Sequence, residues 1–262
     1  MSHVVALYRY PVKGFTPEAC DSLTVQDDGR IAGDRVLGVR FADTAAADDA
    51  WSRKTGMVAL LNTPGLARLH VRFDDKERRL RVSLGASILV DESLNPEGRQ
   101  RIAAALASYV EKQDENPLAG HPERLPLRVI GDGHAPRYHD EEAGGITLHG
   151  RGSLLALQSA IGSEVSETRF RSNIAVDGLA AWEEQGWVGR KIRIGAVDFD
   201  VDHPKTRCLA THANPVTGER DQDIMTTLRQ KFGQERPTFA VAMLPRGGGG
   251  RIRVGDTVTL LD

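Results

Sequence analysis

The strongest constraint on the fold is a regular alternation of apolar and polar residues between positions 69 and 84. Apolar side chains recur at every second position on both sides of a polar turn at 74–77, namely at Leu69, Val71, Phe73, Leu80, Val82 and Leu84. A period of two is that of a strand with one buried face, and the turn between the two segments indicates a β-hairpin. We therefore expect a sheet with one buried face in this part of the chain.

Other short apolar segments predict further strands, and a few longer patterns predict helices. We expect strands at 4–10, 22–25, 36–41, 125–130, 191–201 and 251–261. The last two alternate on either side of glycine, so each is interpreted as a hairpin, and the two hairpins as parts of one barrel. Helical spacing predicts helices over 95–112, 153–161 and 223–233. The predicted fold class is mainly β with short helices.

A polar stretch rich in helix breakers separates two parts of the chain. Residues 113–124 include Asn116, Pro117, Gly120 and Pro122, a composition typical of linkers. We therefore predict an N-terminal β module at 1–115 and a second domain at 116–262. The 262 residues and their 40% hydrophobic content are sufficient to bury a sizeable core.

The overall composition excludes several classes of function. The 34 basic and 36 acidic residues nearly cancel, so no general positive field favours nucleic acid or an anionic membrane, and any anion site must be local. The sequence has no run of about 18 apolar residues and no N-terminal pattern of a secretion signal, which predicts a cytoplasmic protein. Because Cys20 and Cys208 are far apart, we expect free thiols rather than a disulfide framework.

Cys208 is the first candidate for chemistry. It follows a predicted strand, with Lys205 and Arg207 close by in sequence. Nearby cations favour the thiolate, the form that binds metals, but Arg207 and Cys208 point oppositely unless the strand bends between them. The alternative interpretation is a buried, inert thiol. His203 and His212 flank Cys208 without the spacing of a zinc site.

Four cations are candidates for binding an anion. Arg169 and Arg171 lie on one side of the segment 168–178 if it is extended, so they can grip a phosphate or carboxylate, although a solvated strand face is the alternative. Lys13 and Arg35 lie beside glycines and turns, where backbone N–H groups also reach anions.

Three histidines fall in or near a loop expected to be mobile, at 131–145. His134, His139 and His149 accompany Asp140 and Glu141, but their irregular spacing fixes no metal geometry. We interpret them as possible substrate-side residues.

Several motifs together resemble one known family along essentially the whole chain. In order they are YRYPVKG, GDRVLGVR, TRFRSNIAVDG, WVGRKIRIG and PKTRCLATHANPVTGE. This order is similar to that of the MOSC family, named after the C-terminal domain of molybdenum cofactor sulfurase, which includes the amidoxime-reducing proteins. The resemblance implies a β-barrel MOSC fold with a smaller N-terminal β module, and a cofactor bound where the two parts meet.

The resemblance also implies a cofactor and residues that hold it. The cofactor is molybdenum–molybdopterin, and Cys208 is implied to be both the metal ligand and the catalytic residue; pyridoxal phosphate is not expected. The remaining cofactor contacts are implied to be Lys13, Arg35, Arg169, Arg171, Asn173, Arg207 and Thr211. The implied activity is reduction of N-hydroxylated or related small molecules. The implied partners are the substrate and an external electron-donor protein, ferredoxin-like or a reductase, without nucleic acid or membrane.

Three positions depart from the family pattern. Many members have a cysteine where this chain has Lys205, a serine in place of Gly14 and a proline in place of Ser172. The first change removes a second thiol but not the expected ligand. Two alternatives therefore remain: a carrier that holds the cofactor or a sulfur atom on Cys208 without reductase turnover, and a fold that has lost the cofactor and binds another anion.

Overall fold

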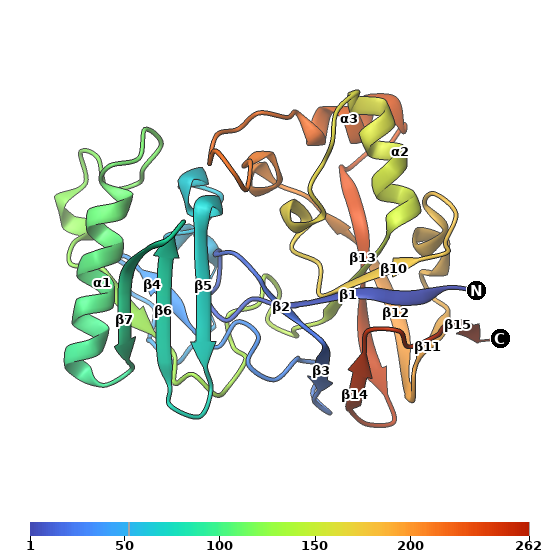
Figure 1. Cartoon of the computed structure of the whole chain (residues 1–262), viewed down its shortest axis with the longest axis horizontal. Helices are drawn as coiled ribbons and strands as arrows, with labels where there is room; N and C mark the ends of the chain where they lie inside the picture. Colours follow the sequence, from blue (N-terminus) through green and yellow to red (C-terminus); the bar gives the residue numbers. More distant parts are fainter. Residues whose placement is uncertain (52, 262) are drawn as a thin grey trace.

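The computed structural model describes residues 1–51 and 53–261. Its largest sheet has eight strands in the order β15-β11-β12-β13-β9-β10-β1-β2, seen in the right half of Figure 1. The bounds of these strands, in chain order, are β1 His3–Arg9, β2 Glu18–Cys20, β9 Ile146–Gly150, β10 Ile174–Asp177, β11 Lys191–Ile194, β12 Val197–Thr206, β13 Thr238–Arg246 and β15 Val258–Leu261. Only β9 and β10 pair in parallel; the other neighbours are antiparallel.

The ladder of this sheet is open, so the expected barrel does not close among the described strands. Its two edge strands are β15 and β2. The start of β1 nevertheless reaches the turn before β15, because Val4 N–H donates to the Asp256 carbonyl at 2.9 Å and Gly255 N–H donates to the Val4 carbonyl at 2.8 Å. The predicted β-rich class is confirmed, and the sheet curls without a continuous ring of strand pairs.

A second group of elements forms the left half of Figure 1. Strands β5 Leu69–Asp74, β6 Arg79–Leu84 and β7 Ser87–Ser93 form a three-stranded antiparallel sheet. The helix α1 Pro96–Val110 packs beside β7, and Asn95 caps its start by accepting from Gly98 N–H at 2.7 Å. A short antiparallel pair in this group is β4 Gly38–Arg40 with β8 Arg128–Ile130. Another short antiparallel pair, β3 Ser22–Val25 with β14 Gly250–Arg253, lies beside the large sheet, to the right of the centre in Figure 1.

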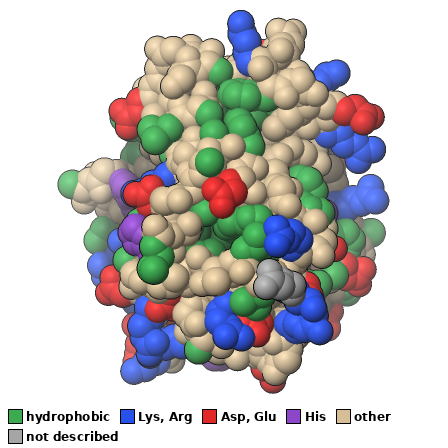
Figure 2. Space-filling view, turned by 90° about the vertical axis from the view of Figure 1, so that its right-hand side faces the viewer, with side chains coloured by type: hydrophobic (Ala, Val, Ile, Leu, Met, Phe, Trp, Pro, Cys, Tyr) green, Lys and Arg blue, Asp and Glu red, His purple; other side chains and the backbone are tan. Residues whose placement is uncertain are grey.

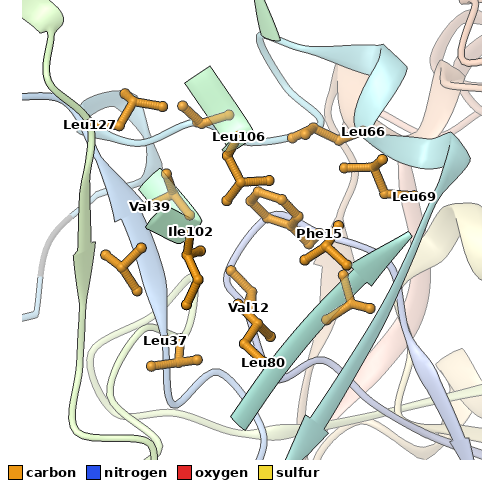
Figure 3. Close-up of a cluster of buried hydrophobic side chains, with 14 of the residues drawn as sticks. Val12, Phe15, Leu37, Val39, Leu66, Leu69, Leu80, Ile102, Leu106 and Leu127 are labelled. Atoms are coloured by element: carbon orange, nitrogen blue, oxygen red, sulfur yellow. The ribbon is translucent and has the colours of Figure 1, made fainter. Parts of the chain in front are cut away.

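A hydrophobic core fills the space between these elements. Figure 3 shows Phe15 at its centre, surrounded by side chains from the strands and from α1. Phe15, Ile102 and Leu106 are all fully buried. Phe15 follows Lys13 and Gly14 directly, so packing of its ring fixes the chain at Lys13. This link between core and loop positions the site described below.

Most of the predicted elements are confirmed. The hairpin predicted at 69–84 is β5 and β6, and the three predicted helices are α1, α2 Arg151–Ile161 and α3 Ile224–Lys231. The hairpin predicted at 191–201 is confirmed as β11 and β12. The hairpin predicted at 251–261 is wrong, because β14 pairs with β3 and β15 pairs with β11. The pattern of alternation was correct there, but the strand partners lie elsewhere in the chain.

Strands from the start of the chain take part in the large sheet. β1 pairs with β10, while β8 returns to pair with β4. The division into 1–115 and 116–262 stays a prediction.

In the described part of the chain, no helix has the length and apolar character needed to cross a bilayer. Figure 2 shows both signs of charge interspersed around the margin of the face at the right-hand end of Figure 1.

Candidate functional site

A polar pocket collects residues from distant parts of the chain. It is lined by the loop after β1, the segment around the 3-10 helix Lys54–Gly56, the turn at 169–171 and the end of β12 with the residues that follow. The lining residues include Lys13, Gly14, Arg35, Lys54, Asp140, Arg169, Arg171, Lys205, Arg207, Cys208 and Thr211. The cofactor-binding residues implied by the family resemblance all line this pocket except Asn173, and the three histidines considered as substrate-side residues do not line it.

Asn173 lies beside the pocket, within the strand framework. Its Oδ1 accepts from the Thr147 hydroxyl at 3.1 Å, and its Nδ2 donates to the Tyr8 carbonyl at 3.1 Å. The side chain is 1% exposed. These contacts connect β1 to β9, so Asn173 supports the wall that carries the pocket residues. A direct cofactor contact from Asn173 stays a prediction.

Lys13 is a buried cation fixed by backbone carbonyls. Its Nζ donates to the carbonyls of Tyr138 at 2.8 Å and His139 at 2.7 Å, and only 3% of the residue is exposed. Burial lowers the pKa of Lys13 from 10.5 to about 8, against the opposing effect of Asp140. Gly14 adopts φ +80°, and a Cβ at that position would lie 2.5 Å from Ala59 Cβ. The serine common in the family therefore cannot replace Gly14 without a shift of the chain.

Arg35 lies next to the buried carboxylate of Asp34. The two side chains form an ion pair, and Asp34 Oδ1 also accepts from Tyr10 N–H at 2.6 Å. Burial raises the pKa of Asp34, but Arg35 and His139 outweigh that effect and hold it at about 2. Two guanidiniums lie near the Tyr10 ring, with Arg35 Cζ 5.1 Å and Arg171 Cζ 4.4 Å from the ring centroid.

Arg169 and Arg171 do not share one side of an extended segment, so that prediction is wrong. The chain forms a 3-10 helix at Glu167–Phe170, and Arg171 has φ +55°. The two side chains consequently diverge. Arg169 pairs with Asp221 at 2.8 Å and donates to the His212 carbonyl at 2.8 Å, whereas Arg171 donates to the Phe15 carbonyl. Both still line the pocket.

Cys208 lies at the junction between a strand and a 3-10 helix. β12 ends at Thr206 after two register shifts against β13, and a 3-10 helix begins at Leu209. The Thr211 hydroxyl donates to the Cys208 carbonyl at 2.9 Å, which fixes this turn. Both cysteines are free, as predicted.

The contacts of the sulfur were not foreseen from the sequence. Lys54 Nζ lies 3.6 Å from Cys208 Sγ and donates to it. Arg207 turns to the Phe170 carbonyl, to which it donates at 2.6 Å. Burial lowers the pKa of Arg207 to about 10, opposed by the neighbouring Cys208.

Asp140 and Glu141 bring negative charge to the same pocket. Asp140 Oδ1 lies 3.4 Å from Lys13 Nζ, and its Oδ2 lies 3.6 Å from Lys54 Nζ. Glu141 pairs with Lys205. The sequence placed both carboxylates in a loop with histidines but gave no signal of their partners, and Lys54 carried no motif at all.

The histidines of that loop do not assemble into a metal site. His139 Nε2 lies 3.4 Å from Asp34, His149 Nε2 lies 3.5 Å from Glu167, and His134 is exposed elsewhere. Among the described residues, no group of three or more histidine, cysteine or carboxylate side chains could hold a metal ion. The chemical groups that line the pocket are the Cys208 thiol, several cations and the Asp140 carboxylate.

Residues 136–259 match the model of the MOSC domain family. This segment contains Cys208, Arg169, Arg171, Arg207 and Thr211. The resemblance to the MOSC family seen in the sequence is thus confirmed for residues 136–259, which match its domain.

Curated relatives with similar segments are named molybdenum cofactor sulfurase. The protein of that name from Caenorhabditis elegans is 34% identical over 117 residues, which are 44% of this chain and 16% of the relative. The Anopheles gambiae protein is 38% identical over 65 residues, 25% of this chain and 8% of the relative. The matched segments are thus a small part of each relative's length.

Solved structures give weaker similarities. The YUAD protein from Bacillus subtilis aligns with a TM-score of 0.41 at 10% identity, over 98% of this chain and 94% of that protein. YiiM from Geobacillus stearothermophilus aligns with a TM-score of 0.33 at 14% identity, over 45% of this chain and 54% of that protein. TM-scores of this size carry no argument about function.

Proposed function

We propose that this protein binds a molybdenum–molybdopterin cofactor in the pocket and uses it to reduce N-hydroxylated or related small molecules. The observation that carries the proposal is the position of Cys208 within a MOSC domain, in one pocket with Lys13, Arg35 and Arg171. A thiolate is a ligand that suits soft metal centres, and cationic side chains suit the phosphate of a pterin. No other described cysteine lies in this pocket.

The residues present fit such a cofactor. The Cys208 thiol is partly exposed and faces the pocket, and Lys54 donates to its sulfur at 3.6 Å. The buried Nε of Arg169 and Oγ of Ser172 have no hydrogen-bond partner among the described residues. Lys13, Arg35 and Arg171 would hold the phosphate, and Cys208 would hold the metal.

The chain's own contribution is binding and orientation. When bound, the molybdenum centre supplies the two-electron chemistry that removes oxygen from the substrate. The protein holds the Cys208 sulfur between the end of β12 and the 3-10 helix that begins at Leu209. The carbonyls of Tyr138 and His139 hold the Lys13 ammonium. We propose further that electrons come from an external donor protein, ferredoxin-like or a reductase.

A second candidate function follows from the names of the relatives. Molybdenum cofactor sulfurase is a name that refers to sulfur transfer, and residues 136–259, which match the family model, include a free cysteine. The alternative is therefore a carrier that binds the cofactor, or a sulfur atom as a persulfide on Cys208, without reducing a substrate. Its mark would be a mass increase of one sulfur atom on Cys208.

The deciding experiment counts molybdenum and released pterin per chain. The full chain is produced in a host that makes the cofactor, as wild type, as Cys208→Ser and as the matched control Cys20→Ser, which removes the free thiol outside the pocket. We expect close to one molybdenum and one pterin per wild-type chain, at least a tenfold loss of molybdenum in Cys208→Ser, and no loss in the control.

Activity then separates the two candidates. Dye-driven reduction of amidoximes by metal-loaded wild type supports the reductase, whereas a persulfide without turnover supports the carrier. Wild-type protein that contains neither metal nor pterin from such a host would refute cofactor binding.

A further inference from the structure

The positive charges of the pocket are unequally neutralised. Four of its cations have a carboxylate partner: Lys13 and Lys54 share Asp140, Arg35 pairs with Asp34, and Lys205 pairs with Glu141. Arg169 is paired with Asp221 outside the pocket lining. Within residues 1–51 and 53–261, Arg171 and Arg207 are the lining cations that donate hydrogen bonds to backbone carbonyls and form no ion pair with a carboxylate.

The carboxylates of Asp34 and Asp140 differ in their exposure and in how firmly their contacts hold them. Asp34 is 1% exposed and is fixed by Tyr10 N–H as well as by Arg35. Asp140, in contrast, has a side chain that is 55% exposed and contacts two lysines at 3.4 and 3.6 Å. Only the charge of Asp140 is therefore shared between two pocket lysines at a position that solvent and ligand can reach.

The backbone holds Asp140 at this position. The carbonyl of the preceding residue, His139, accepts from Lys13 Nζ at 2.7 Å and from Trp51 Nε1 at 3.0 Å. The Tyr138 hydroxyl donates to the Asp48 carbonyl. The segment 138–141 is thus held at the pocket by hydrogen bonds, and a ligand that occupies the pocket has to share the lysines with Asp140.

We propose that Asp140 sets the charge of the anion that the pocket accepts. With Asp140 in place, the seven described cations that line the pocket and the four carboxylates paired with them leave a net charge of +3, which is enough to bind a single phosphate monoester of charge about −1.5 to −2. A polyphosphate carries more charge and would place it against the Asp140 carboxylate, where like charges at about 4 Å repel strongly in a partly desolvated site. Asp140 is thereby a specificity-determining residue that admits one phosphate and disfavours di- and triphosphates.

This inference deepens the proposed function and rests on it, since the phosphate in question is that of the pterin. The test uses inorganic anions and does not need the metal. Binding of inorganic phosphate and of inorganic pyrophosphate is measured by titration calorimetry on the full chain from a host that makes no molybdenum cofactor. The variants are Asp140→Asn and the control Asp132→Asn, whose carboxylate pairs with Arg137 at 3.0 Å and does not line the pocket.

We expect wild type to bind the two anions with affinities within about threefold of each other, because the added charge of pyrophosphate meets Asp140. Asp140→Asn should strengthen pyrophosphate binding at least tenfold and phosphate binding about threefold, and Asp132→Asn should change neither. Glu141→Gln frees Lys205 and changes the contact of Glu141 with His203, which does not line the pocket, so it should give a smaller gain for pyrophosphate.

Three outcomes would overturn the inference. They are an unchanged or weaker affinity for pyrophosphate in Asp140→Asn, an equal gain in Asp132→Asn, and binding of neither anion by wild type and Asp140→Asn. These outcomes are distinct from failure of the proposed function, which is judged by the molybdenum content of wild type. If wild type contains no molybdenum but Asp140→Asn still strengthens pyrophosphate binding, the proposed cofactor binding is refuted and the role of Asp140 in anion selection stands.

Discussion

The two sides of the pocket are held in different ways. The Lys13 side, residues 11–15 with 34 and 35, is attached to a hydrophobic core through Phe15 and has buried polar groups with defined partners. The Cys208 side, residues 205–211, follows an irregular strand end and includes Leu209, which is 45% exposed. The comparison indicates that the Lys13 side contributes more to the stability of the fold than the Cys208 side does.

Removal of the core anchor should give the largest effect. Phe15→Ala deletes a fully buried ring, and substitutions of this kind cost about 3–5 kcal/mol of unfolding free energy. Urea unfolding measures it, with Ile88→Ala as the control because Ile88 is 58% exposed and should cost less than about 1 kcal/mol. Equal small effects from both variants would show that the Lys13 side is not anchored by the core.

Lys13 should make stability depend on pH in the alkaline range. Burial lowers its pKa in the folded protein from 10.5 to about 8, so between these values the unfolded chain binds a proton that the folded chain does not. Wild type should therefore gain about 2–3 kcal/mol relative to Lys13→Met as the pH rises from 7 to 10. Urea unfolding of both proteins at the two pH values measures this gain, and a difference independent of pH would contradict it.

The thiol side should give the smallest effect on stability. Cys208 is partly exposed, and the hydrogen bond to its sulfur comes from Lys54 alone among the described residues. We expect Cys208→Ser to change the unfolding free energy by less than about 1 kcal/mol, measured by urea unfolding of the metal-free protein. A loss comparable to that of Phe15→Ala would remove the distinction between the two sides.

Local patterns predicted the elements of the fold better than their partners. The hairpin at 69–84 was predictable because both strands and the turn lie within one short segment. The segment 251–261 has the same alternation, but each of its strands pairs with a distant strand, and alternation does not identify a partner. The turn at 167–170 was missed because the two arginines were placed by strand spacing, and Arg171 adopts a left-handed conformation.

The site was predictable where a motif carried it. Lys13, Arg35, Arg171 and Cys208 were found through the order of the family's segments, and the structure brings them together. Lys54 and Asp140 were missed as pocket residues for a physical reason. Their contacts join residues far apart in sequence, Lys54 with Cys208 and Asp140 with Lys13, and single charged residues in loops give no periodic signal.

The pairing of β1 with β10 has a consequence for the order in which the molecule can be assembled. During synthesis β1 emerges early, but the residues that it pairs with, Ile174–Asp177, emerge much later. One edge of β1 pairs with β2, which follows soon after it, but the edge that pairs with β10 must wait while most of the chain is made, and such non-local pairing is intrinsically slow. The segment matched by the family, 136–259, therefore lacks the strand that covers the edge of β10, since β1 lies outside it.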